Sequence, residues 1–237
     1  MECFVIFVMA WCWFNATESK PQNVVSNCRK TMKEKYTADS IQALEAGEHI
    51  RLRPKMYFEK CFSENSLDSL PFEVLCHAFD EYFDGNCNEI ELSIWLNSFS
   101  IKYNSGMSLE KSTNENISKA EIIMTKIGAC SNLKKHLAVG QEFCGLGMAT
   151  INFASDNCKL TTVWNNLKGT FEFKNGQTIT KNIESYQSDI SWTEIFVQPN
   201  NLLFDNLHFT SKGIEVKVTE IRKRLKGLNF IVNDWIE

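Results

Sequence analysis

The stretch that decides the fold of this chain runs Tyr36-Thr-Ala-Asp-Ser-Ile-Gln-Ala-Leu-Glu-Ala-Gly-Glu-His-Ile-Arg-Leu-Arg-Pro-Lys-Met-Tyr57. A second distinctive block, Glu121-Ile-Ile-Met-Thr-Lys-Ile-Gly-Ala129, follows it. No repeat, low-complexity tract or Pro/Gly-rich linker separates the blocks or interrupts the sequence after them. We therefore expect one domain from residue 32 to residue 237, a length that can bury one good core.

The composition is that of an ordinary globular protein. Of the 237 residues, 43% are hydrophobic and 23% are charged, both typical values. The net charge of −4 gives no electrostatic case for direct binding to nucleic acid. The basic run Arg222–Lys226 is interpreted as the solvated face of a late helix.

The nine cysteines show no metal-binding or disulfide pattern. They stand at positions 3, 12, 28, 61, 76, 87, 130, 144 and 158, without a Cys-x-x-Cys pair. An odd number in a chain of this length is typical of reduced thiols in a cytoplasmic protein. We expect the cysteines in apolar surroundings to pack as small hydrophobic residues.

The first fourteen residues, Met1–Phe14, are almost entirely apolar. They are shorter than the roughly 20 residues that span a bilayer, and they lack the positive start of a secretory signal. Two interpretations stay open, a targeting segment or an extension ahead of a true start at Met32. We favour Met32, with residues 1–31 disordered or non-native, and we expect no membrane association.

Hydrophobic periodicity predicts helices and strands in a definite order. Helices are expected over 71–84, 118–127, 145–154 and 212–225, and strands over 89–97, 99–103, 159–164, 169–174 and 192–197. The dipeptide Asn175-Gly176 is a strong hairpin signal. This order predicts an α+β two-layer sandwich, with a mixed, mostly antiparallel sheet and helices on one face.

The blocks at 36–57 and 121–129 resemble the ATPase domain of the gyrase B protein and related type IIA topoisomerases. That domain has the GHKL (Bergerat) fold, shared with Hsp90 chaperones, histidine kinases and MutL proteins, and the resemblance covers about 200 residues. It implies ATP and Mg²⁺ as cofactors. It also implies a homodimer through an N-terminal arm carrying Tyr36 and Ile41.

The resemblance places a catalytic helix at Glu73-Val-Leu-Cys-His-Ala-Phe-Asp-Glu81, where the family resembles Glu-x-x-Asp-Asn-x-x-Asp-Glu. Glu73 aligns with the general base that activates water, a role that suits a partly buried carboxylate. Glu73, His77 and Asp80 share one helix face, and Glu81 follows. Without the resemblance, Asp80 and Glu81 would be interpreted as ordinary acids of a helix surface.

His77 departs most from the family pattern. The family has Asn there, whose oxygen coordinates Mg²⁺, and imidazole is a poor substitute because Mg²⁺ prefers oxygen ligands. Cys76 likewise replaces an Asp. His77 is either a packed polar residue or the ligand of an altered metal site, and we favour the first.

The turn that binds adenine in the family, Asp-Asn-Gly-Arg-Gly, is also altered. Here it reads Tyr103-Asn-Ser-Gly-Met107. Strand alternation places Tyr103 at the position of the adenine-binding Asp, whereas an ungapped comparison places Asn104 there and Gly106 at the first glycine. Neither alternative supplies a carboxylate, and losing a charge-assisted hydrogen bond costs about 1.5–3 kcal/mol.

The family's lid, which grips the phosphates, survives only at its end, Gly145-Leu146-Gly147. These amides open a predicted helix and could meet phosphate oxygens, although close helix packing explains the two glycines equally well. Gln141 and Glu142 replace two preceding glycines.

Both lysine positions of the family's lid are lost, and Lys134 or Lys135 is the available substitute. Thr193 aligns with a threonine that supports adenine binding, beside Trp192 in place of glycine. Buried strand packing explains Thr193 equally well.

Two functions remain open. The first is a degenerate gyrase-B-like domain with weak or no hydrolysis, binding a topoisomerase-like protein partner. The second is an active Mg²⁺-dependent ATPase domain of a type II DNA topoisomerase acting with other subunits. We favour the first, and no transducer or nicking module is recognised in the sequence.

Overall fold

A computed structural model describes residues 43–129 and 134–236 of the chain. The described residues from Leu44 on fall in one compact unit. The predictions for residues 1–31, a start at Met32 and the arm residues Tyr36 and Ile41 lie outside the described residues.

The unit is built on one sheet of seven strands in the order β5-β4-β3-β6-β2-β1-β7. The strands are β1 (Glu89–Trp95), β2 (Ser98–Tyr103), β3 (Ser155–Trp164), β4 (Leu167–Lys174), β5 (Gln177–Ser185), β6 (Trp192–Pro199) and β7 (Asn229–Trp235). Neighbours pair antiparallel except β1 and β7, which run parallel.

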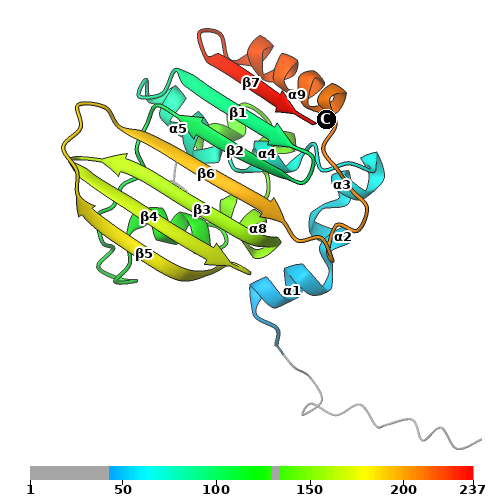
Figure 1. The fold of residues 1–237 in the computed structure, drawn as a ribbon, viewed down its shortest axis with the longest axis horizontal. Coiled ribbons are helices and arrows are strands. Elements are labelled where there is room, and N and C mark those ends of the chain that lie inside the picture. The colour runs from blue at the N-terminus through cyan, green and yellow to red at the C-terminus, as the bar shows by residue number, and fades with distance from the viewer. Residues whose placement is uncertain (1–42, 130–133, 237) are drawn as a thin grey trace, which may run out of the picture. The chain divides into compact units, whose positions relative to one another are not determined.

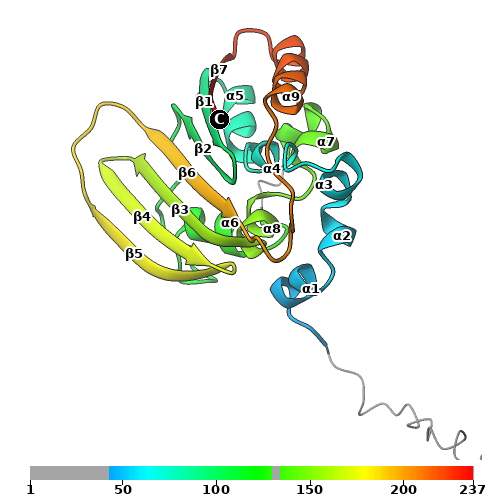
Figure 2. The ribbon, with the colours of Figure 1, turned by 45° about the vertical axis from the view of Figure 1, so that its right-hand side comes forward.

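The helices gather against one face of this sheet (Figures 1 and 2). They are α1 (Ala46–Leu52), α2 (Pro54–Tyr57), α3 (Glu59–Glu64), α4 (Leu70–Glu73), α5 (Cys76–Phe83), α6 (Lys119–Thr125), the 3-10 helix η2 (Lys135–Ala138), α7 (Gln141–Cys144), α8 (Met148–Phe153) and α9 (Ser211–Arg224). The predicted α+β sandwich with a mixed sheet is therefore confirmed. Across residues 43–129 and 134–236, no helix is both long and apolar enough to cross a membrane.

The core lies between the sheet and the helices because the strands alternate as the sequence predicts. In β1, Ile90, Leu92 and Ile94 are buried while the residues between them are more exposed. Two hairpin turns use residues that tolerate positive φ. Asn165-Asn166 joins β3 to β4, and Asn175-Gly176 joins β4 to β5.

Two predicted helices differ from the observed ones. The helix expected over 71–84 divides into α4 and α5, because Leu75 N–H bonds to Phe72 O, an i→i−3 contact at 3.2 Å. The helix expected over 145–154 begins only at Met148, because Gly147 has φ +78°. Strands β5 and β7 had no predicted counterpart.

Candidate functional site

Glu73 is the last residue of α4 and is buried, with 5% of its surface exposed. Its Oε2 accepts hydrogen bonds from the backbone N–H groups of Leu146 (2.7 Å) and Gly147 (3.4 Å). Burial raises the pKa of Glu73 to about 7, against the lowering effect of these two bonds and of Lys60. The carboxyl is therefore poised near neutral pH and anchored to the turn that precedes α8.

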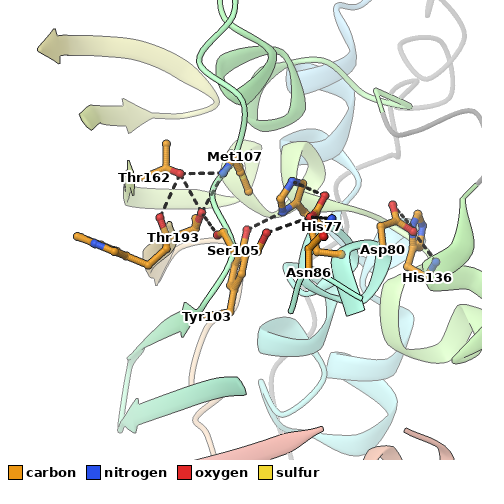
Figure 3. A network of polar contacts seen from close by, with 11 residues as sticks. His77, Asp80, Asn86, Tyr103, Ser105, Met107, His136, Thr162 and Thr193 are labelled. Atoms are coloured by element: carbon orange, nitrogen blue, oxygen red, sulfur yellow. Dashed lines mark hydrogen bonds and ion pairs between the residues drawn. The ribbon is translucent and has the colours of Figure 1, made fainter. Parts of the chain in front are cut away.

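His77 of α5, which is partly buried, pairs with the buried Tyr103 at the end of β2 (Figure 3). The Tyr103 hydroxyl hydrogen-bonds His77 Nδ1 at 3.1 Å, and Tyr103 is 2% exposed. Burial lowers the pKa of His77, opposed by Glu81 and Asp80, and burial raises the pKa of Tyr103. Both side chains are therefore neutral at pH 7.

Asn104 points away from this pair. It is exposed, and its Oδ1 accepts the backbone N–H groups of Asn88 and Glu89 at 3.0 and 3.1 Å. Of the two residues considered for the adenine-contact position, Tyr103 is thus the one that reaches helix α5.

Thr193 belongs to a fully buried hydroxyl network on β6 (Figure 3). Its Oγ1 donates to Ser105 O at 2.7 Å, lies 2.9 Å from Thr162 Oγ1 and accepts from Met107 N–H at 3.2 Å. Gly106 is held close to β3, because a Cβ there would lie 2.2 Å from Val163 O. The network fixes the path of the chain after β2.

Replacing Thr193 with valine should lower the free energy of unfolding by about 1–3 kcal/mol, because Ser105 O and Thr162 Oγ1 would each lose a buried partner. Met107 N–H keeps its hydrogen bond to Thr162 Oγ1 at 2.8 Å. Chemical denaturation measures the change. Thr161→Val, on the neighbouring half-exposed position of β3, is the matched control and should change stability little. Equal effects in the two variants would contradict the role assigned to the network.

Asp80 of α5, which is partly buried, forms a second pair with the buried His136 of η2. The backbone N–H of His136 donates to Asp80 Oδ1 at 2.6 Å, and its Nδ1 lies 3.0 Å from both carboxylate oxygens. One turn further along α5, Lys135 pairs with Asp84. Helix η2 is therefore held against α5.

Glu81 and Glu142 are held by other partners. Glu81 Oε2 accepts from Ser105 Oγ and from Asn86 Nδ2, both at 3.0 Å. Glu142 pairs with Arg224 of α9 at 2.6 Å, and its carboxylate is not among the groups lining the neighbouring cavity.

Two cavities adjoin these pairs. One, of about 300 Å³, is lined by residues of η2, α7 and the turn Gly145-Leu146-Gly147. The other, of about 400 Å³, lies between α5 and α6 and is lined by His77, Asp80, Glu81 and Asp84 among others. Cys76, Ile123 and Ala129 line both cavities.

Six of the predicted site residues line the two cavities, namely His77, Asp80, Glu81, Gly145, Leu146 and Gly147. The other predicted site residues that the structure describes line neither cavity, namely Glu73, Tyr103, Asn104, Gly106 and Thr193. Sequence reasoning missed His136 and Ser105, since neither stands in a recognisable motif and their partners lie 56 and 24 residues away. Among the described residues, no group of three or more His, Cys, Asp or Glu side chains could hold a metal ion.

Comparison with known proteins finds that this chain is similar to gyrase B proteins. The gyrase B protein of Rickettsia typhi is 30% identical over 204 residues, covering 84% of this chain and 25% of the relative. Its counterpart in Haloferax volcanii is 25% identical over 206 residues, covering 84% and 32%. The chain therefore spans about a quarter to a third of the length of these relatives. No family model matches the chain.

Among solved structures, the 43K ATPase domain of Thermus thermophilus gyrase B, in complex with an aminocoumarin, superposes with a TM-score of 0.64. The identity is 21%, and the match covers 81% of this chain and 49% of that one. The described unit has the GHKL fold. In sequence and fold together, it is a divergent domain of the gyrase B ATPase type.

Proposed function

We propose that this chain is a gyrase-B-like GHKL domain that has lost ATP turnover and acts by binding a partner. The observation that carries the proposal is the buried Tyr103 with its hydrogen bond to His77. A tyrosine without charge at neutral pH stands where the resemblance implies the carboxylate that accepts the adenine amino group. Loss of that acceptor weakens adenine binding by about ten- to a hundred-fold.

The residues beside the pair do not fit Mg²⁺. The ion demands near-octahedral oxygen ligands, but His77 offers only ring nitrogens, and its Nδ1 is hydrogen-bonded to Tyr103. Asp80 is already hydrogen-bonded to His136. No catalytic step is therefore assigned to a metal ion here.

ATP binding and hydrolysis test the proposal. Calorimetry with ATP and Mg²⁺ should give a dissociation constant in the millimolar range or no signal, and phosphate release should equal that of a protein-free control. His77→Asn alone should not restore turnover, because Tyr103 still stands at the adenine position. Hydrolysis by the unmodified chain that Glu73→Ala abolishes would refute the proposal.

The second candidate is an active ATP-hydrolysing domain of a type II DNA topoisomerase. The observation that favours it is the raised pKa of Glu73, about 7, since a general base works best when its pKa lies near the operating pH. The hydrolysis assay and Glu73→Ala distinguish this candidate from the first.

The proposal includes two kinds of partner. One is a second copy of the chain, through the arm residues Tyr36 and Ile41, and the other is a topoisomerase-like protein. A cytoplasmic location is part of the proposal, and it is supported by the five described cysteines, all free and buried. Light scattering at micromolar concentration should give a monomer without nucleotide.

A further inference from the structure

A short segment of the chain forms one wall of the smaller of the two cavities. We call it the strap and define it as residues 137–144, which comprise the end of η2 and the whole of α7. Leu137, Gln141 and Cys144 of the strap line the cavity of about 300 Å³. Cys144 is only 2% exposed, so a molecule in solution can reach its thiol only when the strap moves.

Arg224, in the last turn of α9, holds the strap at three points (Figure 2). Its Nη1 donates to the backbone oxygen of Val139 and, at 2.6 Å, to the carboxylate of Glu142. Its guanidinium carbon lies 5.2 Å from the centre of the Phe143 ring, a cation–π contact. Its Nε donates to Glu220 of α9 at 3.1 Å, and this bond orients the guanidinium. One side chain of α9 therefore contacts a carbonyl, a carboxylate and an aromatic ring of the strap.

Two weaker contacts hold the strap from α3 and α4. Lys60 Nζ donates to the Glu142 carbonyl oxygen at 2.9 Å, and Cys144 Sγ donates to Phe72 O at 3.2 Å. The first contact is exposed to water, and a thiol is a weak donor. Glu142 is the one charged residue of the strap, and its bond to Arg224 joins opposite charges, which makes a hydrogen bond shorter and stronger. We therefore expect Arg224 to be the strongest single tie of the strap.

We infer that Arg224 is a clasp that keeps the strap closed, so that access to the cavity is controlled from α9. Without Arg224, the carbonyl of the buried Val139 loses this donor. The same turn of α9 is also fixed to the edge of the sheet, because Arg222 Nη2 donates to Phe230 O of β7 at 2.8 Å. A displacement of this turn withdraws the clasp and opens the cavity. The inference goes beyond the proposed function and does not depend on it.

Hydrogen exchange of the full chain, measured without nucleotide, tests the clasp. Arg224→Ala should raise the exchange rates of the Gly140 and Phe143 amides, which bond within the strap, by about tenfold. This is the change expected when one or two net hydrogen bonds are lost and the segment opens locally. The amides of β3 should exchange as in the unmodified chain. Lys223→Ala is the matched control, because Lys223 lies in the same turn, is 70% exposed and pairs only with Glu220 among the described residues. It should leave both sets of rates unchanged.

The reactivity of Cys144 is a second readout of the same opening. A thiol reagent should modify Cys144 about tenfold faster in Arg224→Ala, whereas Cys158, buried on β3, should react as slowly as before. Glu142→Gln keeps the shape of the side chain and removes only its charge, so it should accelerate Cys144 by about threefold. Arg224→Lys keeps the positive charge and should lie between the unmodified chain and Arg224→Ala.

Two outcomes would overturn the inference. If the strap and β3 both exchange faster in Arg224→Ala, by similar factors, Arg224 stabilises the whole domain and is not a clasp. If neither the strap amides nor Cys144 respond, the contacts from Lys60 and Phe72 hold the strap without it. ATP is absent from these measurements, so the loss of ATP turnover stands or falls separately in the hydrolysis assay.

Discussion

Replacing Tyr103 with alanine should lower the free energy of unfolding by about 3–5 kcal/mol, the range for truncating a large aromatic side chain in a core. Tyr103 is among the largest fully buried side chains of the described residues. Its removal leaves a void between β2 and α5 and deprives His77 Nδ1 of its hydrogen-bond partner. Urea denaturation followed by tryptophan fluorescence measures the change.

Two variants separate the ring from the hydroxyl. Tyr103→Phe keeps the ring and removes the hydroxyl with its contact to His77, so it should cost about 1 kcal/mol. Tyr186→Ala removes a half-exposed tyrosine that contacts Lys168 and should change stability little.

Chemical rescue tests whether Tyr103 fills the cavity itself. Millimolar phenol should raise the thermal midpoint of Tyr103→Ala and not that of the unmodified chain, because an engineered apolar void of this kind binds small aromatic molecules. A cost below about 1 kcal/mol for Tyr103→Ala would mean that the side chain is not part of the packed core. The main support for the loss of adenine binding would then disappear.

The sequence predicted those parts of the fold in which local pattern and burial agree. β1 alternates cleanly because one of its faces packs on the helices, and the apolar residues predicted for that face of β2, namely Phe99, Ile101 and Tyr103, are buried. The range of β5 was not predicted, because β5 is an edge strand that is exposed along almost its whole length. Its sequence shows no alternation of apolar and polar residues. β7 is half polar and lies at the other edge of the sheet, paired with β1, so its position depends on a contact that no local pattern encodes.

The candidate site likewise contains residues that sequence motifs predicted and residues that no motif marked. Glu73 and the glycines of the Gly145–Gly147 turn stand in motifs, and the structure joins them through the Glu73 carboxyl. The Asp80–His136 pair crosses 56 residues, and no motif marks it. The sequence suggested that His77 is a packed polar residue or a metal ligand, and its bond to Tyr103 supports the first interpretation without testing metal binding directly.

Replacing Glu73 with glutamine should stabilise the protein at high pH and much less at low pH. The folded pKa of Glu73, about 7, lies above the ordinary value of 4.5, so the folded state binds the proton more tightly than the unfolded chain does. The contribution of Glu73 to the free energy of unfolding is therefore fully present below about pH 4.5. It falls as the pH rises towards 7 and is lost above pH 7. This difference between the folded and the ordinary pKa of Glu73 corresponds to about 3 kcal/mol in the free energy of unfolding.

Glutamine is a close mimic of the protonated acid, because its carbonyl oxygen can accept from Leu146 N–H and it carries no charge to bury. The stability advantage of Glu73→Gln over the unmodified chain should therefore grow by about 2–3 kcal/mol between pH 5 and pH 8, measured by urea denaturation.

Glu110→Gln is the control of opposite sign, since the pKa of Glu110 is lowered by Lys119. That variant should gain nothing as the pH rises. A Glu73→Gln advantage that is the same at pH 5 and pH 8 would mean that Glu73 titrates normally, and it would remove the argument that Glu73 is a base poised near neutral pH.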